Sequence, residues 1–586
     1  MYKRYSIVIL LLTSVLAMSC QKFLEEVNPN KLATDNFWKT LDDCDAGLTS
    51  VYSAFKNPNV LAIEAESNRS DLTYPGYGRP NTSNEYYLQM FTNASAAPNS
   101  KWEALYRGIF RANQVIKAIN DLSSTVKTAA ETERANTIMA QARFFRGLYY
   151  FYLHNSFNKG SVIIYDFVPQ NESEFYQSVK PAAEVQAFYL ADLKFAYENL
   201  PGRWANERDL GRVTAGAAAS VLGQSYLYDK DFATAKTYFK DVIENPDYGY
   251  ALVAEIGDNF TTKNELNSES ILEIGYSLKY KGEISVWSED QVSNTLSYAL
   301  SPVGGWKTLY PSSWLILAYK NDKMDESDPR NYVTDAGGVQ RLRKYSLRTS
   351  YSIALVDDPD LNYYGVTPAQ ATFFNNQETA YFRKYTNWDI VRNETDIVPN
   401  IRSGVNVRVI RLADVYLMYA ECLIGQGADN SGVQEALTYI NRVRHRSALE
   451  LLGPNGSGEY PSASHDNVSY TAETLMNHLM YLERPLELSI EGNAVRTIDM
   501  RRWGITKQRF QELSQKRYYG EHYQYTKVDG MPDWRWESIL NEGSKDGYKV
   551  IQDYAQAAGN FNQEAHAYWP LPSSEIVSNP DLNGKK

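Results

Sequence analysis

The stretch that decides the predicted fold is YLERPLELSIEGNAVRTIDMRRWG, residues 481–504. From Leu482 onward its pattern predicts a helix, because Leu482, Leu486 and Ile490 recur every four residues and therefore share one face. Pro485 has no backbone N–H to donate, so we expect the helix to begin near this residue rather than to run through it.

A stripe of glutamates, Glu483, Glu487 and Glu491, adjoins this apolar face. Carboxylates at this spacing repel one another on an isolated helix, so cations must meet them. The nearest candidates in the sequence are Arg484, Arg496, Arg501 and Arg502. One interpretation is a catalytic acid–base pair, which needs a cleft and two different environments. A regular stripe shows no such difference, so we favour a structural ion-pair network through Glu487, Glu491 and Arg496.

The same stretch resembles the C-terminal pattern of the SusD/RagB family, E-R-x-x-E-L-x-x-E-G-x-x-x-x-D-x-x-R-W. The matching residues are Glu483-Arg484, Glu487-Leu488, Glu491-Gly492, Asp499 and Arg502-Trp503. Pro485 departs from the pattern, because the family often has a second basic residue there. The resemblance implies an outer-membrane lipoprotein that binds nutrients, mostly glycans, and acts as the lid of a SusC-like TonB-dependent transporter.

Three further segments resemble the family in the expected order. They are the run from Phe23 to Pro29, the run W-x-x-L-Y-x-x-I-x-x-A-N beginning at Trp102, and the ending that starts at Tyr568-Trp569-Pro570. The resemblance therefore covers residues 20–586 and implies a single SusD-like domain.

Residues 1–19 are predicted to be a targeting segment. Lys3-Arg4 is a short basic region, and the mostly apolar residues 6–18 are too few to span a bilayer as a mature helix. The small residues before Cys20 resemble a bacterial lipobox, although Leu16 lies one place earlier than usual. We expect lipid attachment at Cys20, and the resemblance implies that the protein faces the cell exterior; an ordinary secretory signal is the alternative.

Helical periodicity dominates the middle of the chain. Helices are predicted at residues 102–122, 131–154, 184–200, 212–229, 233–243, 411–425 and 433–446. Their small and aromatic residues resemble degenerate tetratricopeptide repeats. We therefore predict a mainly α fold, a repeat superhelix formed by residues 100–245 and 405–447. A loop-rich insertion with short strands, one of them at 269–276, fills residues 250–400, and the C-terminal pattern occupies 470–586.

The predicted ligand surface combines residues 66–100 and 280–315. The first segment is long, punctuated by turn residues and rich in Tyr, which is typical of a functional loop. Aromatic rings stack on the C–H faces of sugars, while Asp, Asn and Arg bind hydroxyl groups. The candidates are Asp71, Tyr74, Tyr77, Arg79, Asn81, Tyr86, Trp287 and Trp306. The alternative is that these tyrosines only hold the loop against the core.

Several classes of function are disfavoured. A net charge of −11 over 586 residues argues against nucleic acid as a partner, since phosphate binding needs a cationic face. There is no P-loop, G-x-S-x-G or paired-His motif, and Cys44 and Cys422 form no zinc pattern. The acidic run at 358–362 lacks the Gly and Glu of a calcium loop. We expect no enzyme, cofactor or metal. A glycoside hydrolase, a scaffold without a ligand, and a peptide-binding protein remain alternatives.

Overall fold

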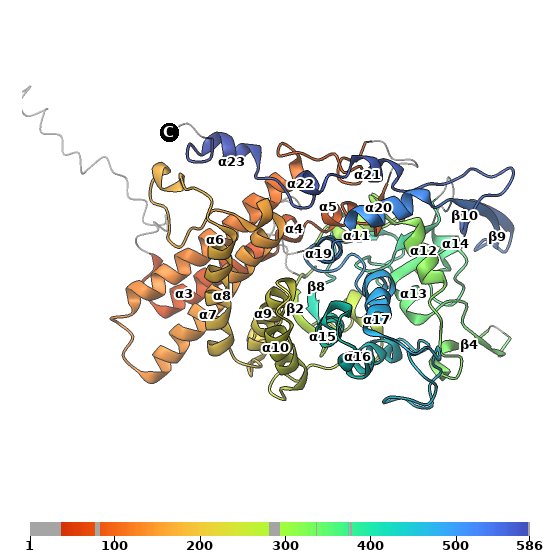
Figure 1. Ribbon diagram of the computed structural model, residues 1–586, viewed down its shortest axis with the longest axis horizontal. Coiled ribbons are helices and arrows are strands. Elements are labelled where there is room, and N and C mark those ends of the chain that lie inside the picture. The colour runs from red at the N-terminus through yellow and green to blue at the C-terminus, as the bar shows by residue number, and fades with distance from the viewer. Residues whose placement is uncertain are drawn as a thin grey trace, which may run out of the picture.

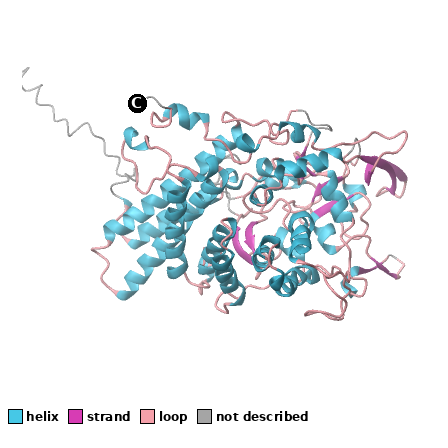
Figure 2. Ribbon diagram, viewed as in Figure 1, coloured by secondary structure: helices cyan, strands magenta, loops and turns pink. Residues whose placement is uncertain are grey.

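The computed structural model describes residues 37–76, 83–279, 293–335, 337–372, 374 and 378–583 (Figure 1). The predicted targeting segment with Cys20, and the ligand candidates Tyr77, Arg79, Asn81 and Trp287, lie outside these residues. The prediction of a mainly α-helical fold with short strands is confirmed (Figure 2).

Successive helices pack side by side to form the repeat part of the fold, each contacting the next. They are α3 (Leu41–Phe55), α6 (Ala96–Leu122), α7 (Ala129–Ser156), α8 (Ala182–Asn199), α9 (Ala215–Tyr228), α10 (Phe232–Glu244), α15 (Leu412–Leu423) and α16 (Val433–Arg446). Helix α3 begins at Leu41, because the Thr40 side chain accepts a hydrogen bond from the N–H of Asp43 and caps the helix there. Helix α15 continues the stack directly from α10, although a long insertion separates them in sequence.

Small residues allow these helices to approach closely. A Cβ atom added to Gly108 in α6 would lie 2.3 Å from the ring of Tyr149 in α7. In α9, a Cβ atom on Gly223 would lie 2.5 Å from the ring of Phe239 in α10. Each aromatic ring therefore occupies the space that a side chain on the facing helix would need.

The insertion between α10 and α15 begins and ends in one small sheet, in which β2 (Ser270–Ile274) pairs antiparallel with β8 (Val407–Arg411). This confirms the predicted strand and returns the chain to the helical stack. The insertion also contains α11 (Leu296–Leu300), β3 (Leu309–Pro311), α12 (Ser313–Lys320), β4 (Tyr332–Thr334), β5 (Gln340–Leu342), α13 (Leu347–Ser352), β6 (Ile353–Leu355), α14 (Pro368–Ala371) and β7 (Ala380–Phe382).

A second small sheet joins the Tyr-rich segment to the insertion. After the short helices α4 (Pro58–Leu61) and α5 (Ile63–Asn68), strand β1 (Thr73–Pro75) pairs antiparallel with β3, placing Tyr74 opposite Tyr310. The two parts of the predicted ligand surface are thus held together by backbone hydrogen bonds.

The C-terminal part consists of short helices and one hairpin. Its elements are α17 (Ala472–His478), a π-helical turn (Leu479–Glu483), α18 (Arg484–Glu487), α19 (Val495–Arg502), α20 (Thr506–Gln515), β9 (Tyr518–Thr526), β10 (Pro532–Glu542), α21 (Ala555–Asn560), α22 (Gln563–His566) and α23 (Ser573–Ser578).

The single amphipathic helix predicted from Leu482 through Ile490 is wrong. Helical structure ends at Glu487, and Ile490 is left-handed with φ 57°. Leu482 is 41% exposed, whereas Leu486 is buried, so these leucines do not share one face. Pro485 does lie in the first turn of α18, but the preceding π-helical turn continues the helix backwards to α17.

The glutamate stripe lies in a buried network of charges. Glu491 accepts hydrogen bonds from Lys384 Nζ at 2.6 Å and from Arg411 Nε at 2.7 Å. Glu487 accepts from Arg411 at 2.7 Å and from Arg446. The acidic and basic members of the buried network are Glu269, Asp322, Glu483, Glu487 and Glu491 with Arg348, Lys384, Arg411, Arg444 and Arg446. The network thus joins the repeat helices, the insertion and the C-terminal segment.

Arg496 does not belong to this network, which corrects the prediction for this residue. Its guanidinium binds the Asp71 carboxylate, with Nε 2.7 Å from Oδ1. Arg484 and Arg502 bind Asp499 instead, and Arg501 donates to the backbone oxygens of Asn155 and Ala567. The arginines that meet the stripe come from distant segments, because the local arginines bind other acids or backbone oxygens.

Acid is expected to weaken the fold through Glu487. Burial alone raises the pKa of this carboxyl, but Arg446, Arg411 and Arg348 outweigh that effect and hold the pKa at about 2. An unfolded glutamate titrates near pH ~4.3, so the stabilisation that comes from ionised Glu487 is complete above that pH and is lost as pH falls toward ~2; by linkage it amounts to about 3 kcal/mol. Guanidinium unfolding at pH 6, 5, 4 and 3 should therefore show a steeper loss of stability for the wild type than for Glu487→Gln. Equal slopes for the two proteins would contradict this prediction.

Candidate functional site

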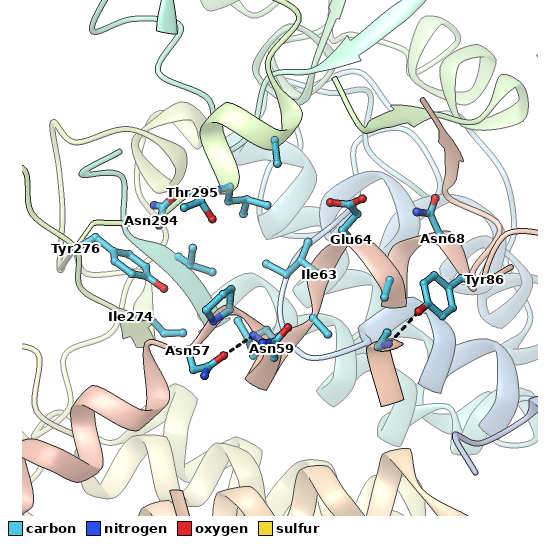
Figure 3. Close-up of a pocket in the computed structure, with 18 of the residues that line it drawn as sticks. Asn57, Asn59, Ile63, Glu64, Asn68, Tyr86, Ile274, Tyr276, Asn294 and Thr295 are labelled. Atoms are coloured by element: carbon cyan, nitrogen blue, oxygen red, sulfur yellow. Dashed lines mark hydrogen bonds between the residues drawn. The ribbon is translucent and has the colours of Figure 1, made fainter. Parts of the chain in front are cut away.

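A cavity of about 270 Å³ opens between the Tyr-rich segment and the insertion (Figure 3). Its walls combine amide, carboxyl and phenol groups with aliphatic side chains. The lining residues are Asn57, Pro58, Asn59, Leu61, Ala62, Ile63, Glu64, Ala65, Asn68, Asn84, Tyr86, Ala97, Ile274, Tyr276, Asn294, Thr295, Leu296, Ala299 and Val407. Residues from both predicted ranges, 66–100 and 280–315, are among them.

A sharp turn between α4 and α5 shapes one wall. The Asn57 side chain accepts a hydrogen bond from the N–H of Asn59 at 3.0 Å and caps α4. Ala62, at φ 50°, ends α4 in a left-handed conformation and starts α5 in a new direction. The turn places Glu64 and Asn68, on α5, in the cavity wall (Figure 3).

The opposite wall is held by hydrogen bonds that leave little freedom. The Tyr276 hydroxyl donates to the backbone oxygen of Lys56 at 3.1 Å, which ties the end of β2 to α3. Asn294 accepts from the N–H of Leu296 at 3.0 Å and also donates to the backbone oxygen of Val405. These contacts fix the wall before any ligand arrives, which lowers the entropic cost of binding.

The chemistry of the cavity suits a neutral ligand with many hydroxyl groups. Asparagine amides offer both donors and acceptors, and Ile63 and Leu296 offer apolar contact. The Glu64 side chain keeps access to solvent, yet the surrounding protein raises the pKa of its carboxyl above the ordinary value, an effect that Thr308 partly opposes. Glu64 adds a strong acceptor to the cavity wall.

Two of the predicted ligand residues are buried, so their side chains are closed to a ligand. The Asp71 carboxylate has no exposed surface, because Arg496 and Arg509 bind both of its oxygens at 2.7–2.8 Å. Burial raises the pKa of Asp71, but the two arginines lower it further, below its ordinary value. Tyr74 is also buried, with its ring packed against Tyr87 at 5.4 Å between centroids. In this structure both side chains make contacts inside the protein and none with the cavity.

Tyr86 lines the cavity, whereas Trp306 does not. The Tyr86 hydroxyl accepts from the N–H of Ala97 at 2.9 Å, and its ring packs edge-on against Trp569. Trp306 is half-buried, and its ring lies edge-to-face with that of Tyr298, with 5.2 Å between the ring centroids.

Sequence reasoning missed most of the polar residues that line the cavity. They are Asn57, Asn59, Glu64, Asn68, Asn84, Tyr276, Asn294 and Thr295. A sequence signal exists for Asn57 and Asn59, because Asn57-Pro58-Asn59 is typical of a turn and precedes the predicted ligand segment 66–100.

The arrangement of carboxylates does not resemble a hydrolytic site. Glu483, Glu487 and Glu491 are buried and paired, so a substrate cannot reach them. Among the described residues that line the cavity, Glu64 is the only carboxylic acid, whereas glycoside hydrolysis uses two. Within the described ranges, no helix combines the length and the apolar character that crossing a membrane requires.

Comparison with known proteins establishes the family. Residues 268–585 match the model of the SusD family, and residues 22–227 match a model described as starch-binding associating with outer membrane. The chain belongs to the SusD family, and the resemblance seen in the sequence is confirmed. A SusD-like protein from Bacteroides ovatus is 23% identical, over 99% of this chain and 98% of that protein.

Solved structures share the fold. A laminarin-binding SusD-like protein, 21% identical, superimposes with a TM-score of 0.60 over 92% of this chain and 97% of its own. A crystal structure with xylogluco-oligosaccharide, also 21% identical, has a TM-score of 0.64 over 93% and 98%. At this level of identity the comparison concerns the architecture of the chain.

Proposed function

We propose that this protein captures oligosaccharides without cleaving them, and that the cavity between α4, α5 and α11 is part of the capture site. The observation that carries the proposal is the lining itself, in which five asparagines, Glu64 and two tyrosines occur together with aliphatic side chains. Such walls exchange hydrogen bonds with sugar hydroxyls and contact the C–H faces of the rings. Relatives of the same fold that bind laminarin or carry a xylogluco-oligosaccharide support this ligand class.

The proposal extends to where the protein works. One matching family model is described as associating with the outer membrane, which supports a location there. With lipid on Cys20, the chain would be tethered at that membrane and face outward. The helical repeats would then dock on a SusC-like TonB-dependent barrel, and the captured glycan would pass into it. Glu64 is the only carboxyl among the described residues of the cavity wall, which favours binding over hydrolysis.

Removing polar groups from the cavity is expected to weaken glycan binding. In Asn59→Ala/Glu64→Ala, two exposed polar side chains that line the cavity are lost. Each hydrogen bond to a ligand contributes about 1 kcal/mol, so affinity should fall by roughly tenfold or more. Isothermal titration with laminarin or xyloglucan oligosaccharides measures this change.

The matched control is Glu133→Ala, which removes an exposed carboxylate from α7, where it lines none of these walls. It should leave both affinity and melting temperature unchanged. If the cavity variant folds normally and binds as tightly as the wild type, this cavity is not the capture site.

A further inference from the structure

The C-terminal hairpin β9–β10 carries two exposed tryptophans that the proposed capture site does not use. Trp534 is 46% exposed and Trp536 is 56% exposed. In the described part of the chain, no other tryptophan is among the exposed hydrophobic side chains. The hairpin lies at the edge of the molecule, at the end away from α6, α7 and α8 (Figure 1). A cluster of large apolar side chains exposed to solvent indicates a binding surface.

The strand register puts these rings on one face. Trp534 pairs with Gln524 of β9, and the period of two along each strand adds Trp536 and His522 to the same face. The ring centroids of Trp534 and Trp536 lie 6.4 Å apart with planes inclined at 35°. His522 lies 4.3 Å from Trp536, and Tyr548 lies 5.3 Å from His522. We call Trp534, Trp536, His522 and Tyr548 the aromatic strip.

The other face of the hairpin is anchored to the body of the protein. The Arg535 guanidinium donates two hydrogen bonds, at 2.8 and 2.6 Å, to the backbone oxygen of Ala369 in α14. Gln370 donates to the backbone oxygen of Thr526 at 2.9 Å, and Tyr523 and Ile539 pack against the core. The strip is therefore displayed on a rigid support.

A bulge in β10 sets the position of Trp536. Between Arg535 and Ile539 the register shifts, and Glu537 adopts a left-handed conformation with φ 53°. The N–H of Glu537 donates to His522 Nδ1 at 3.2 Å, which keeps the two strands together there. Opposite the bulge, a Cβ atom on Gly520 would lie 2.2 Å from the backbone oxygen of Glu537, so only glycine fits at this position. The bulge directs Trp536 over His522.

Polar groups accompany the strip. Gln524 is exposed beside Trp534, and Lys545, which is paired with Glu521, has its ammonium 5.2 Å from the Tyr548 ring centroid. The strip members themselves carry N–H or O–H groups at their edges. A surface that alternates aromatic faces with hydrogen-bonding edges matches a ligand that alternates C–H faces with hydroxyls.

We propose that the aromatic strip is a second glycan-binding site, at which neighbouring sugar rings of one chain stack on Trp534 and Trp536. Two ring faces side by side suit successive units of a polysaccharide better than a single sugar. Because the rings are held in place beforehand, little conformational entropy is lost on binding. A second contact on the same chain increases the overall affinity for long glycans. The inference rests on the proposed function in one respect, namely that the protein binds glycans.

Affinity electrophoresis tests the proposal, with the full chain run in gels cast with laminarin, xyloglucan or starch. Trp534→Ala/Trp536→Ala should lower the affinity for the polysaccharide that retards the wild type by about tenfold. Trp534→Phe/Trp536→Phe keeps the ring faces and should retain most of the retardation. The control is Phe175→Ala, which removes a ring that is also 46% exposed; it should migrate like the wild type.

The outcomes separate the two proposals. If the wild type is retarded and the double Ala variant is retarded equally, the strip is not a glycan site, while the proposed function stands; a surface that docks another protein predicts that result. If no polysaccharide retards the wild type, the proposed function fails and the strip fails with it. The melting temperature of the double Ala variant should match that of the wild type. If the double variant does not fold, the single variant Trp534→Ala gives the test, because among the described rings that of Trp534 contacts only that of Trp536.

Discussion

Replacing Arg411 by alanine is expected to lower the free energy of unfolding by about 3–5 kcal/mol, because it strips the central cation from a buried network. The Arg411 side chain is 1% exposed and donates to three carboxylates, those of Glu269, Glu487 and Glu491, at 2.7 Å each. Without it, Glu491 keeps Lys384 and Glu487 keeps Arg446, but the like charges face each other with less compensation in a medium that screens poorly. Guanidinium unfolding at pH 7, followed by circular dichroism, measures the change.

Arg442 provides the matched control for this prediction. It lies on α16 and pairs with Glu459, but both side chains reach solvent, with 29% and 40% of their surface exposed. Exposed pairs contribute little, so Arg442→Ala should cost less than about 1 kcal/mol. Arg411→Lys should fall between the two, because one ammonium cannot reach all three acids. A loss for Arg411→Ala as small as that for Arg442→Ala would show that the network does not stabilise the fold.

The repeat helices were predictable from the sequence because their signals are local. Apolar periodicity acts within one or two turns, and packing between helices, such as that of Gly223 against Phe239, reinforces it. The stripe of Glu483, Glu487 and Glu491 also showed correctly that cations must be nearby. Which cations they are was not predictable, because Arg411 and Lys384 reach the stripe only after the insertion has folded back.

The backbone at the end of α18 was also not predictable from local sequence. Ile490 and Ala494 adopt left-handed conformations, which disfavour residues with a Cβ atom and which no local pattern indicates. The ion pairs made by Glu487 and Glu491 on either side hold this turn against local preference. The hairpin β9–β10, by contrast, has a local signal in the sequence, since Asp529-Gly530 separates two segments rich in Tyr and Trp.

The candidate site, too, was predictable from the sequence only in part. Composition and turn residues pointed to two segments that both contribute residues to the cavity, because ligand-binding loops need aromatic and amide groups. They could not separate Tyr86, which lines the cavity, from Asp71 and Tyr74, which are buried. That distinction depends on Arg496 and Arg509, which approach Asp71 from the far end of the chain.

Replacing Asp71 by alanine is therefore expected to destabilise the protein rather than to abolish ligand binding directly. The change leaves Arg496 and Arg509 buried beside each other without their shared carboxylate, at a cost of about 3–5 kcal/mol. Asp71→Asn keeps an acceptor oxygen but removes the charge, so its loss should be smaller. Chemical unfolding gives the stability, and titration with an oligosaccharide below the unfolding transition gives the affinity of the folded protein.

The control for Asp71 is Asp45, whose carboxylate pairs with Arg212 at 3.1 Å while 38% of its side chain remains exposed. Asp45→Ala should cost less than about 1 kcal/mol, because water already screens that pair. A folded Asp71→Ala protein with normal stability and no glycan affinity would reverse the assignment, because Asp71 would then act on the ligand. Lost stability with unchanged affinity would instead show that Asp71 joins the N-terminal segment to α19 and α20, and that it supports the cavity only by holding this part of the fold in place.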